Sequence, residues 1–179
     1  MAPDPLTELV DEGRAAEGVA VRGRERAMRQ MAEEEARLAG TLIDLVERAS
    51  TVAVRTETGR TYHGVLLAVG ADYCALRTAG GAEPHLRLSA IATVRPHPGE
   101  RHVPAAGDRP PPVDLLLLEV LARAVAHSTR VTLFTRGGDT VVGRLLAVGA
   151  DVVTVRPEAG GREPCYVAGA AITEALVEG

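Results

Sequence analysis

The sequence predicts a mainly β protein with helices, organised as two tandem units that each consist of one helix followed by a small five-stranded barrel. Three observations predict this organisation: a long internal repeat, roughly alternating apolar and polar residues within each repeat, and a helix-like segment before each repeat. The chain has 179 residues, of which 46% are hydrophobic and 25% charged, and its formal net charge is −4. These values are typical of one or two small folded domains.

The internal repeat is the most specific of these signals. Val52–Arg77 aligns without gaps on Val131–Arg156, and 13 of the 26 positions are identical. The run LLAVGAD occurs in both segments, which indicates a tandem duplication. Repetition of the same residues favours a role in the fold, because a single active site would need them only once. The repeated positions are Gly59, Gly64, Gly70, Asp72 and Arg77 in the first repeat, and Gly138, Gly143, Gly149, Asp151 and Arg156 in the second.

The helices and the boundaries between units follow from composition and spacing. Residues 1–30 hold few large apolar side chains, which predicts a tail or a frayed helix. Residues 31–95 form the first unit, with a helix behind the acidic run Glu33–Glu35, whose charges favour the N-terminal half of a helix. Residues 96–112 contain six of the eleven prolines and are expected to be an extended linker. Residues 113–179 form the second unit, whose helix is expected to carry Asp114 in its first turn.

The strands of each unit are short and punctuated by glycine. Gly64 and Gly143 fall in the middle of the second strand, where a missing side chain allows the sharp bend that closes a small barrel. Asp72 and Asp151 follow the repeated glycine and are expected to accept backbone N–H bonds within their own turns. Arg77 and Arg156 are expected to brace these turns or a neighbouring acid.

The pattern of Gly59, Gly64, Leu66 and Asp72 resembles the first motif of the Sm-like family (LSm and Hfq), and Leu86–Ile91 resembles its second motif. The resemblance implies an SH3-like small barrel, a role in RNA binding, and contacts between units through strand edges. The tandem units could therefore satisfy each other's edges inside one chain or join neighbouring chains. The family's base pocket is incomplete, because the chain has no Asn and Arg87 is not followed by Gly.

Charge and composition weigh against a general nucleic-acid binder. The first unit carries five arginines against three carboxylates over residues 50–96, and the second carries five against six over residues 128–179. Aromatic residues make up 2% of the chain, which leaves few side chains for base stacking. If nucleic acid binds, the candidate contacts are Arg55, Arg60 and Arg87.

No pattern predicts catalysis, a metal site or a cofactor. The residues with ligand chemistry lack the spacing of metal motifs, and the second repeat keeps none of the histidines. They are His63, Cys74, His85, His97 and His102. The chain begins without a signal-peptide pattern, and its two cysteines lie in strand-like segments, so we expect reduced thiols and a cytoplasmic location. Twenty arginines without a lysine are typical of a GC-rich, bacterial genome.

From these observations the sequence predicts a non-enzymatic binding or scaffolding protein that acts through protein contacts, with a protein partner or self-association. The alternative is an Sm-like RNA or DNA regulator that uses the arginines of the first unit. A basic face formed by Arg55, Arg60 and Arg87 would favour the alternative, whereas an exposed apolar groove would favour protein contacts.

Overall fold

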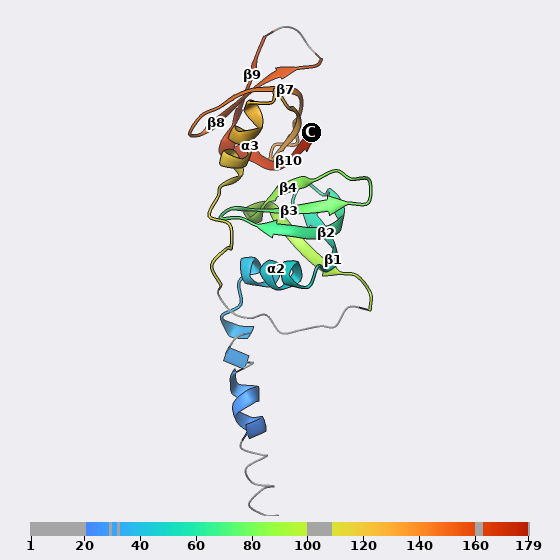
Figure 1. Cartoon of the computed structure of the whole chain (residues 1–179), viewed down its shortest axis with the longest axis vertical. Helices are drawn as coiled ribbons and strands as arrows, with labels where there is room; N and C mark the ends of the chain where they lie inside the picture. Colours follow the sequence, from blue (N-terminus) through green and yellow to red (C-terminus); the bar gives the residue numbers. More distant parts are fainter. Residues whose placement is uncertain (1–20, 29, 32, 100–108, 160–162, 179) are drawn as a thin grey trace, which may run out of the picture.

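A computed structural model describes most of the chain (Figure 1). The described residues are 21–28, 30–31, 33–99, 109–159 and 163–178. Most of the predicted tail lies outside them, whereas the described residues between 21 and 34 are helical and extend away from the sheet (Figure 1). The middle of the predicted linker is also outside the described residues. Its end is fastened to the first helix, because Arg109 pairs with Asp44 (3.2 Å) and Glu47 (2.7 Å).

The two repeats contain the same elements in the same order. The first repeat consists of α2 (Leu38–Glu47), β1 (Thr51–Thr56), β2 (Thr61–Val69), β3 (Tyr73–Thr78), β4 (Pro84–Arg87), the short 3₁₀ turn η1 (Leu88–Ala90) and β5 (Ile91–Pro96). The second consists of α3 (Leu117–Val125), β6 (Arg130–Thr135), β7 (Thr140–Val148), β8 (Val152–Pro157), β9 (Cys165–Ala168), η2 (Gly169–Ala171) and β10 (Ile172–Glu178).

The prediction of two separate five-stranded barrels is wrong. All ten strands form one open sheet in the order β5-β1-β2-β3-β4-β10-β6-β7-β8-β9, and every neighbouring pair is antiparallel. The repeats join where β4 pairs with β10, with Leu86 opposite Glu174 and His85 opposite Ala175. Unpaired backbone groups at a strand edge need partners. Here the edge of one repeat satisfies the edge of the other, so the sheet continues between repeats instead of closing within each.

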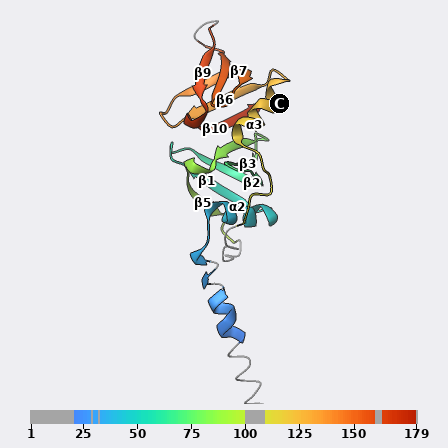
Figure 2. The same cartoon turned by 90° about the vertical axis from the view of Figure 1, so that its left-hand side faces the viewer.

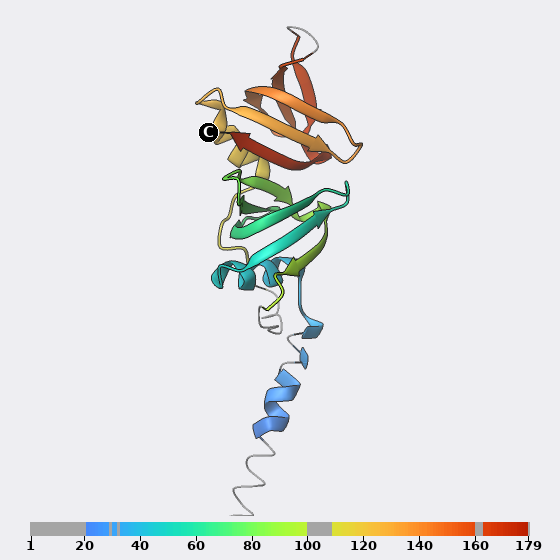
Figure 3. The same cartoon turned by 90° about the vertical axis from the view of Figure 1, so that its right-hand side faces the viewer.

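The internal repeat extends to strand register. Val52 lies opposite Gly64 in the first repeat, and Val131 lies opposite Gly143 in the second. The register also shifts at corresponding places in β2 and β7, between Leu66 and Ala68 and between Leu145 and Ala147. In three dimensions the two sets of strands follow each other along the long axis of the molecule (Figure 2; Figure 3).

Gly64 and Gly143 are required by close backbone contact. A Cβ atom at Gly64 would lie 2.2 Å from the carbonyl oxygen of Arg77, and one at Gly143 would lie 2.1 Å from that of Arg156. These distances are far inside van der Waals contact. Glycine was predicted here for a sharp bend that closes a barrel; the structure instead shows that it is required by the close approach of the neighbouring strand.

Both predicted helices form, but each begins later than predicted. α3 begins at Leu117, because the residues before it are held in an extended path: Val113 bridges Gly70, and Ala71 donates its N–H to the Leu115 oxygen (2.9 Å). Asp114 is therefore outside the first turn. In the same way α2 begins at Leu38 after an extended residue and has no acidic residue in its first turn, so Glu33–Glu35 precede the helix rather than start it.

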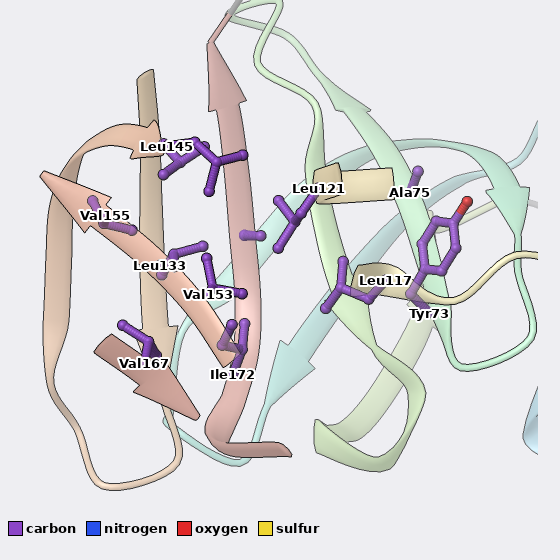
Figure 4. Close-up of a cluster of buried hydrophobic side chains, with 12 residues drawn as sticks. Tyr73, Ala75, Leu117, Leu121, Leu133, Leu145, Val153, Val155, Val167 and Ile172 are labelled. Carbon is purple, nitrogen blue, oxygen red and sulfur yellow. The ribbon is translucent and has the colours of Figure 1, made fainter. Parts of the chain in front are cut away.

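Two buried clusters form the core, and one of them spans both repeats. The first contains residues of the first repeat alone, including Leu42 of α2 and Val54, Leu66 and Leu76 of the sheet. The second combines the strands of the second repeat with α3 and with two residues of β3, Tyr73 and Ala75. In Figure 4 Leu117 and Leu121 lie between these β3 residues and the second-repeat core. α3 is thus packed against both repeats.

Candidate functional site

Arg87 and Asp72 form a polar cluster that joins the two repeats. The Arg87 guanidinium pairs with the Asp72 carboxylate and donates to the carbonyl oxygens of Ile172 (2.8 Å) and Gly169 (2.9 Å) in the second repeat. The other Asp72 oxygen accepts the N–H of Leu117 (2.7 Å), the first residue of α3. A carboxylate in this position satisfies an unpaired amide and complements the positive end of the helix. Asp72 was predicted to accept hydrogen bonds within its own turn. Its side chain instead caps a helix that begins 45 residues away.

A second cluster surrounds Glu174, whose side chain is 0% exposed. Its two oxygens accept the hydroxyls of Thr58 and Tyr62, each at 2.6 Å. The Arg60 guanidinium lies 3.9 Å from the same carboxylate and 3.8 Å above the Phe134 ring. Burial, followed by the hydrogen bond to Glu174, raises the pKa of Tyr62 above its usual range. These three polar partners of Glu174 are needed because a buried carboxylate is costly unless it is paired.

The predicted nucleic-acid contacts do not gather on one face. Arg60 and Arg87 are engaged between the repeats, as described above. Arg55 lies exposed on β1, between Thr61 of β2 and Thr93 of β5. A third pair, Glu57 with Arg136 at 2.6 Å, links the β1–β2 turn to the β6–β7 turn. The arginines nearest the junction thus carry acidic partners.

The other repeated positions separate into two groups. Arg77 pairs with Glu83 (2.9 Å), in agreement with a bracing role, whereas Arg156 is exposed on β8 opposite Arg144. Gly59 and Gly138 have positive φ angles of 86° and 92°, which explains glycine in these turns. Gly70 is buried: a Cβ there would lie 2.1 Å from the Tyr73 ring, whereas Gly149 is exposed. Asp151 is exposed as well.

The face of the second repeat that corresponds to this junction is uncovered. Tyr166 of β9 is 70% exposed, and Leu146 of β7 is also exposed. A groove of about 480 Å³ also lies along β7, β8 and β9. Its lining is largely apolar and consists of Thr140, Val141, Val142, Pro157, Glu158, Ala159 and Cys165. An exposed apolar groove is the feature that the sequence analysis associated with protein contacts, and here it lies next to the outer strand β9.

The candidate metal ligands are dispersed. Among the described residues no group of three or more His, Cys, Asp or Glu side chains is close enough to hold a metal ion. His63 and His97 are exposed, and His102 lies outside the described residues. Cys74 is buried, which raises the pKa of its thiol to about 12. His85 lies 5.7 Å from the Tyr73 ring; its Nδ1 atom is buried without a hydrogen-bond partner, and burial lowers its pKa.

Sequence reasoning missed the central residues of the junction, Glu174, Tyr62 and Thr58. A signal was present in the repeat itself, because the positions where the repeats differ carry the junction. Strand register and element order place Thr93 at the position of Glu174, Val141 at that of Tyr62, and Ala168 at that of Arg87. Identical positions maintain the common fold, whereas these unlike positions distinguish the joined face from the free one.

No helix among the described residues is both long and apolar enough to cross a membrane. Comparison with protein-family models, with curated proteins and with solved structures found no match. The resemblance to the Sm-like family therefore stays a prediction that depends on the motif residues alone.

Proposed function

We propose that this protein is a non-enzymatic binding or scaffolding module, working in the cytoplasm, that acts through protein contacts at the two ends of its sheet. One observation carries the proposal. β4 and β10 pair with each other in the middle of the sheet, whereas their counterparts β9 and β5 are its outer strands. Outer strands present unpaired N–H and C=O groups to any strand that can reach them.

The surroundings of β9 support this proposal. Natural edge strands are usually protected by charges, proline or a covering segment. The four residues of β9 are Cys, Tyr, Val and Ala, none of them charged; Tyr166 is 70% exposed, and Cys165 lines the apolar groove. Tyrosine is a common anchor in protein interfaces, since it supplies a large apolar area with little loss of conformational entropy.

Nucleic-acid binding has less support from the arrangement of charges. Phosphate recognition requires a concentrated basic surface. Two of the three candidate arginines, Arg60 and Arg87, instead contact Glu174 and Asp72. Only Arg55 of the three is exposed on a strand face.

A capture experiment from native lysate tests the proposal. The bait is the full chain, compared with the variant Tyr166→Lys/Ala168→Lys, which places two positive charges on β9. The matched control is Ala122→Lys/Ala126→Lys, which adds the same charge to the exposed face at the end of α3. We expect a protein partner that survives nuclease treatment and is lost with the β9 variant only. Capture that disappears with nuclease would contradict the proposal and favour the RNA or DNA alternative.

A further inference from the structure

The junction between the two repeats shows which surfaces of a repeat pair with another repeat. On the first repeat, β4 is covered by β10, and the neighbouring face of β3 is covered by α3 of the second repeat. Because the repeats share strand order and register, the corresponding face of the second repeat consists of β9 and β8. This face carries no such cover in the described structure.

Position by position, this face of the second repeat is more exposed than its counterpart. Tyr73 is 5% exposed, whereas Val152 at the same position of β8 is only half-buried. His85 is half-buried, whereas Tyr166 is 70% exposed. The groove lined by Val141, Pro157 and Cys165 is found at the place where, in the first repeat, Glu174 and Leu176 of β10 lie against Tyr62 and Pro84.

The opposite end of the molecule carries β5 and α2, the counterparts of the strand and helix that cover this face in the first repeat. β5 is the counterpart of β10 and forms the other outer strand of the sheet. α2, which precedes it, is the counterpart of α3. Leu117 begins α3 and is 0% exposed because it packs between the repeats, whereas Leu38 begins α2 and is 40% exposed. The apolar side chain that enters the internal junction thus has an uncovered equivalent.

A helix cap points to the same pairing. In the internal junction Asp72 of one repeat accepts the Leu117 N–H at the start of the next repeat's helix. Asp151 is the equivalent acid, and it is exposed. At the start of α2 no side-chain hydrogen bond from the N-cap residue satisfies the helix amides. The exposed acid is at one end of the molecule, and the helix whose N-cap residue makes no side-chain cap hydrogen bond is at the other.

Resting on the proposed function, we infer that the partner of β9 is β5 of another molecule of this protein, paired antiparallel as β4 pairs with β10. Transfer of the β4–β10 register places Val167 opposite Thr93, Tyr166 opposite Val94, and Cys165 opposite Arg95. Leu38 then covers the β8–β9 face, and Asp151 caps α2 of the neighbour. The contact is heterologous, so each molecule uses a different surface at each end.

The chemistry of this contact differs from that of the internal junction. The salt bridge of Arg87 has no equivalent, since Ala168 replaces the arginine, and the buried carboxylate of Glu174 is replaced by the hydroxyl of Thr93. Strand hydrogen bonds and apolar burial carry the association instead. We therefore expect it to be concentration-dependent and weakly affected by salt, because few charge pairs are available to be screened.

A disulfide between register partners tests this inference. Residues directly opposite each other in antiparallel strands have Cα atoms about 4.5–5.5 Å apart, within the range that a disulfide spans. In the full-length variant Arg95→Cys, the new thiol and the native Cys165 of a neighbour should be joined by mild oxidation. Arg95 is exposed, so the substitution leaves the core intact. His63→Cys, which places an equally exposed thiol on the inner strand β2, is the matched control.

The expected result is a set of covalent multimers from Arg95→Cys, with the 95–165 linkage identified by mass spectrometry. Arg95→Cys/Cys165→Ser and His63→Cys should give at least tenfold less. Sedimentation velocity should show mass that rises with concentration for the native chain and not for Tyr166→Lys/Ala168→Lys. A 95–95 linkage, or a native chain that stays monomeric at all concentrations, would overturn the inference. If the monomeric chain still captures a nuclease-resistant protein through β9, the proposed function stands and only the identity of the partner is wrong.

Discussion

The two repeats are alike in their strands and unlike in their surroundings. In the first repeat the β3–β4 face is buried by α3 and β10, and its charged residues Asp72 and Arg87 are paired with each other. In the second repeat the β8–β9 face is exposed and bears Tyr166 and an apolar groove. The comparison teaches that duplication supplies one fold twice, whereas differences at a few positions determine which face is joined inside the chain and which is left for a partner.

The largest expected effect is on the feature that both repeats share. Gly64→Val and Gly143→Val each drive a branched side chain into a carbonyl oxygen, at Arg77 and at Arg156 respectively. We expect each to lower the free energy of unfolding by about 1–3 kcal/mol or more, measured by urea denaturation. Gly80→Ala is the control, because a Cβ there meets no atom within 4 Å. Equal midpoints for all three variants would mean that the close approach is absent.

The next effect separates the joined face from the free one. Glu174→Ala removes the acceptor of the Thr58 and Tyr62 hydroxyls and should destabilise the chain by about 1–3 kcal/mol, less than the glycine variants. Thr93→Ala, at the equivalent exposed position of β5, should change stability by about 0.5 kcal/mol or less. Similar losses in the two variants would show that the repeats do not differ in the way described.

A smaller effect concerns Arg87. Its contacts with Asp72, Gly169 and Ile172 predict that Arg87→Ala lowers stability by about 1–3 kcal/mol. RNA binding should stay weak, with Kd above about 10⁻⁵ M near physiological salt, in Arg87→Ala, in the exposed-site control Arg55→Ala and in the unmodified chain. Fluorescence anisotropy with U-rich and A-rich oligonucleotides provides the measurement. Submicromolar binding that Arg87→Ala abolishes would instead support the RNA alternative.

The smallest effect depends on pH. Burial lowers the pKa of His85, so the unfolded chain binds more protons than the folded chain once pH falls below the ordinary histidine pKa of about 6.5. Stability from this site is therefore present at neutral pH and is lost as pH falls from about 6.5 towards the lowered value. His85→Phe should flatten the dependence of the urea midpoint on pH in this range. His63→Gln, at an exposed position, is the matched control, and an equal change in both variants would contradict the assignment.

Much of the secondary structure was predictable, because it depends on local signals. The repeated glycines marked the turns at Gly59 and Gly138, where φ is positive, whereas the close approach at Gly64 and Gly143 was not predicted. The helical spacing of apolar residues predicted both helices. The start of α3 was misplaced because a long-range backbone contact between Ala71 and Leu115 holds the preceding residues extended. Local propensity contains no information on such contacts.

The topology of the sheet and the role of the candidate site were not predictable in the same way. Five strands per repeat are compatible with closure into a barrel or with continuation into a neighbour. The choice depends on whether β4 pairs with β10, and that pairing is determined by tertiary packing between the repeats. Arg87 was chosen from its motif and charge, but its partners Gly169 and Ile172 lie more than 80 residues away. Glu174 was missed because a buried acid with distant partners has no local signature.

Amide hydrogen exchange measured at several protein concentrations tests the central claim, that the sheet is continuous between repeats and open at its ends. At low concentration, β4 and β10 should be protected as inner strands, whereas β5 and β9 exchange quickly from their outer edges. As concentration rises, protection should appear in β5 and β9 together and not change in β4 and β10. Exchange in β4 and β10 as fast as in β9 at every concentration would contradict the account.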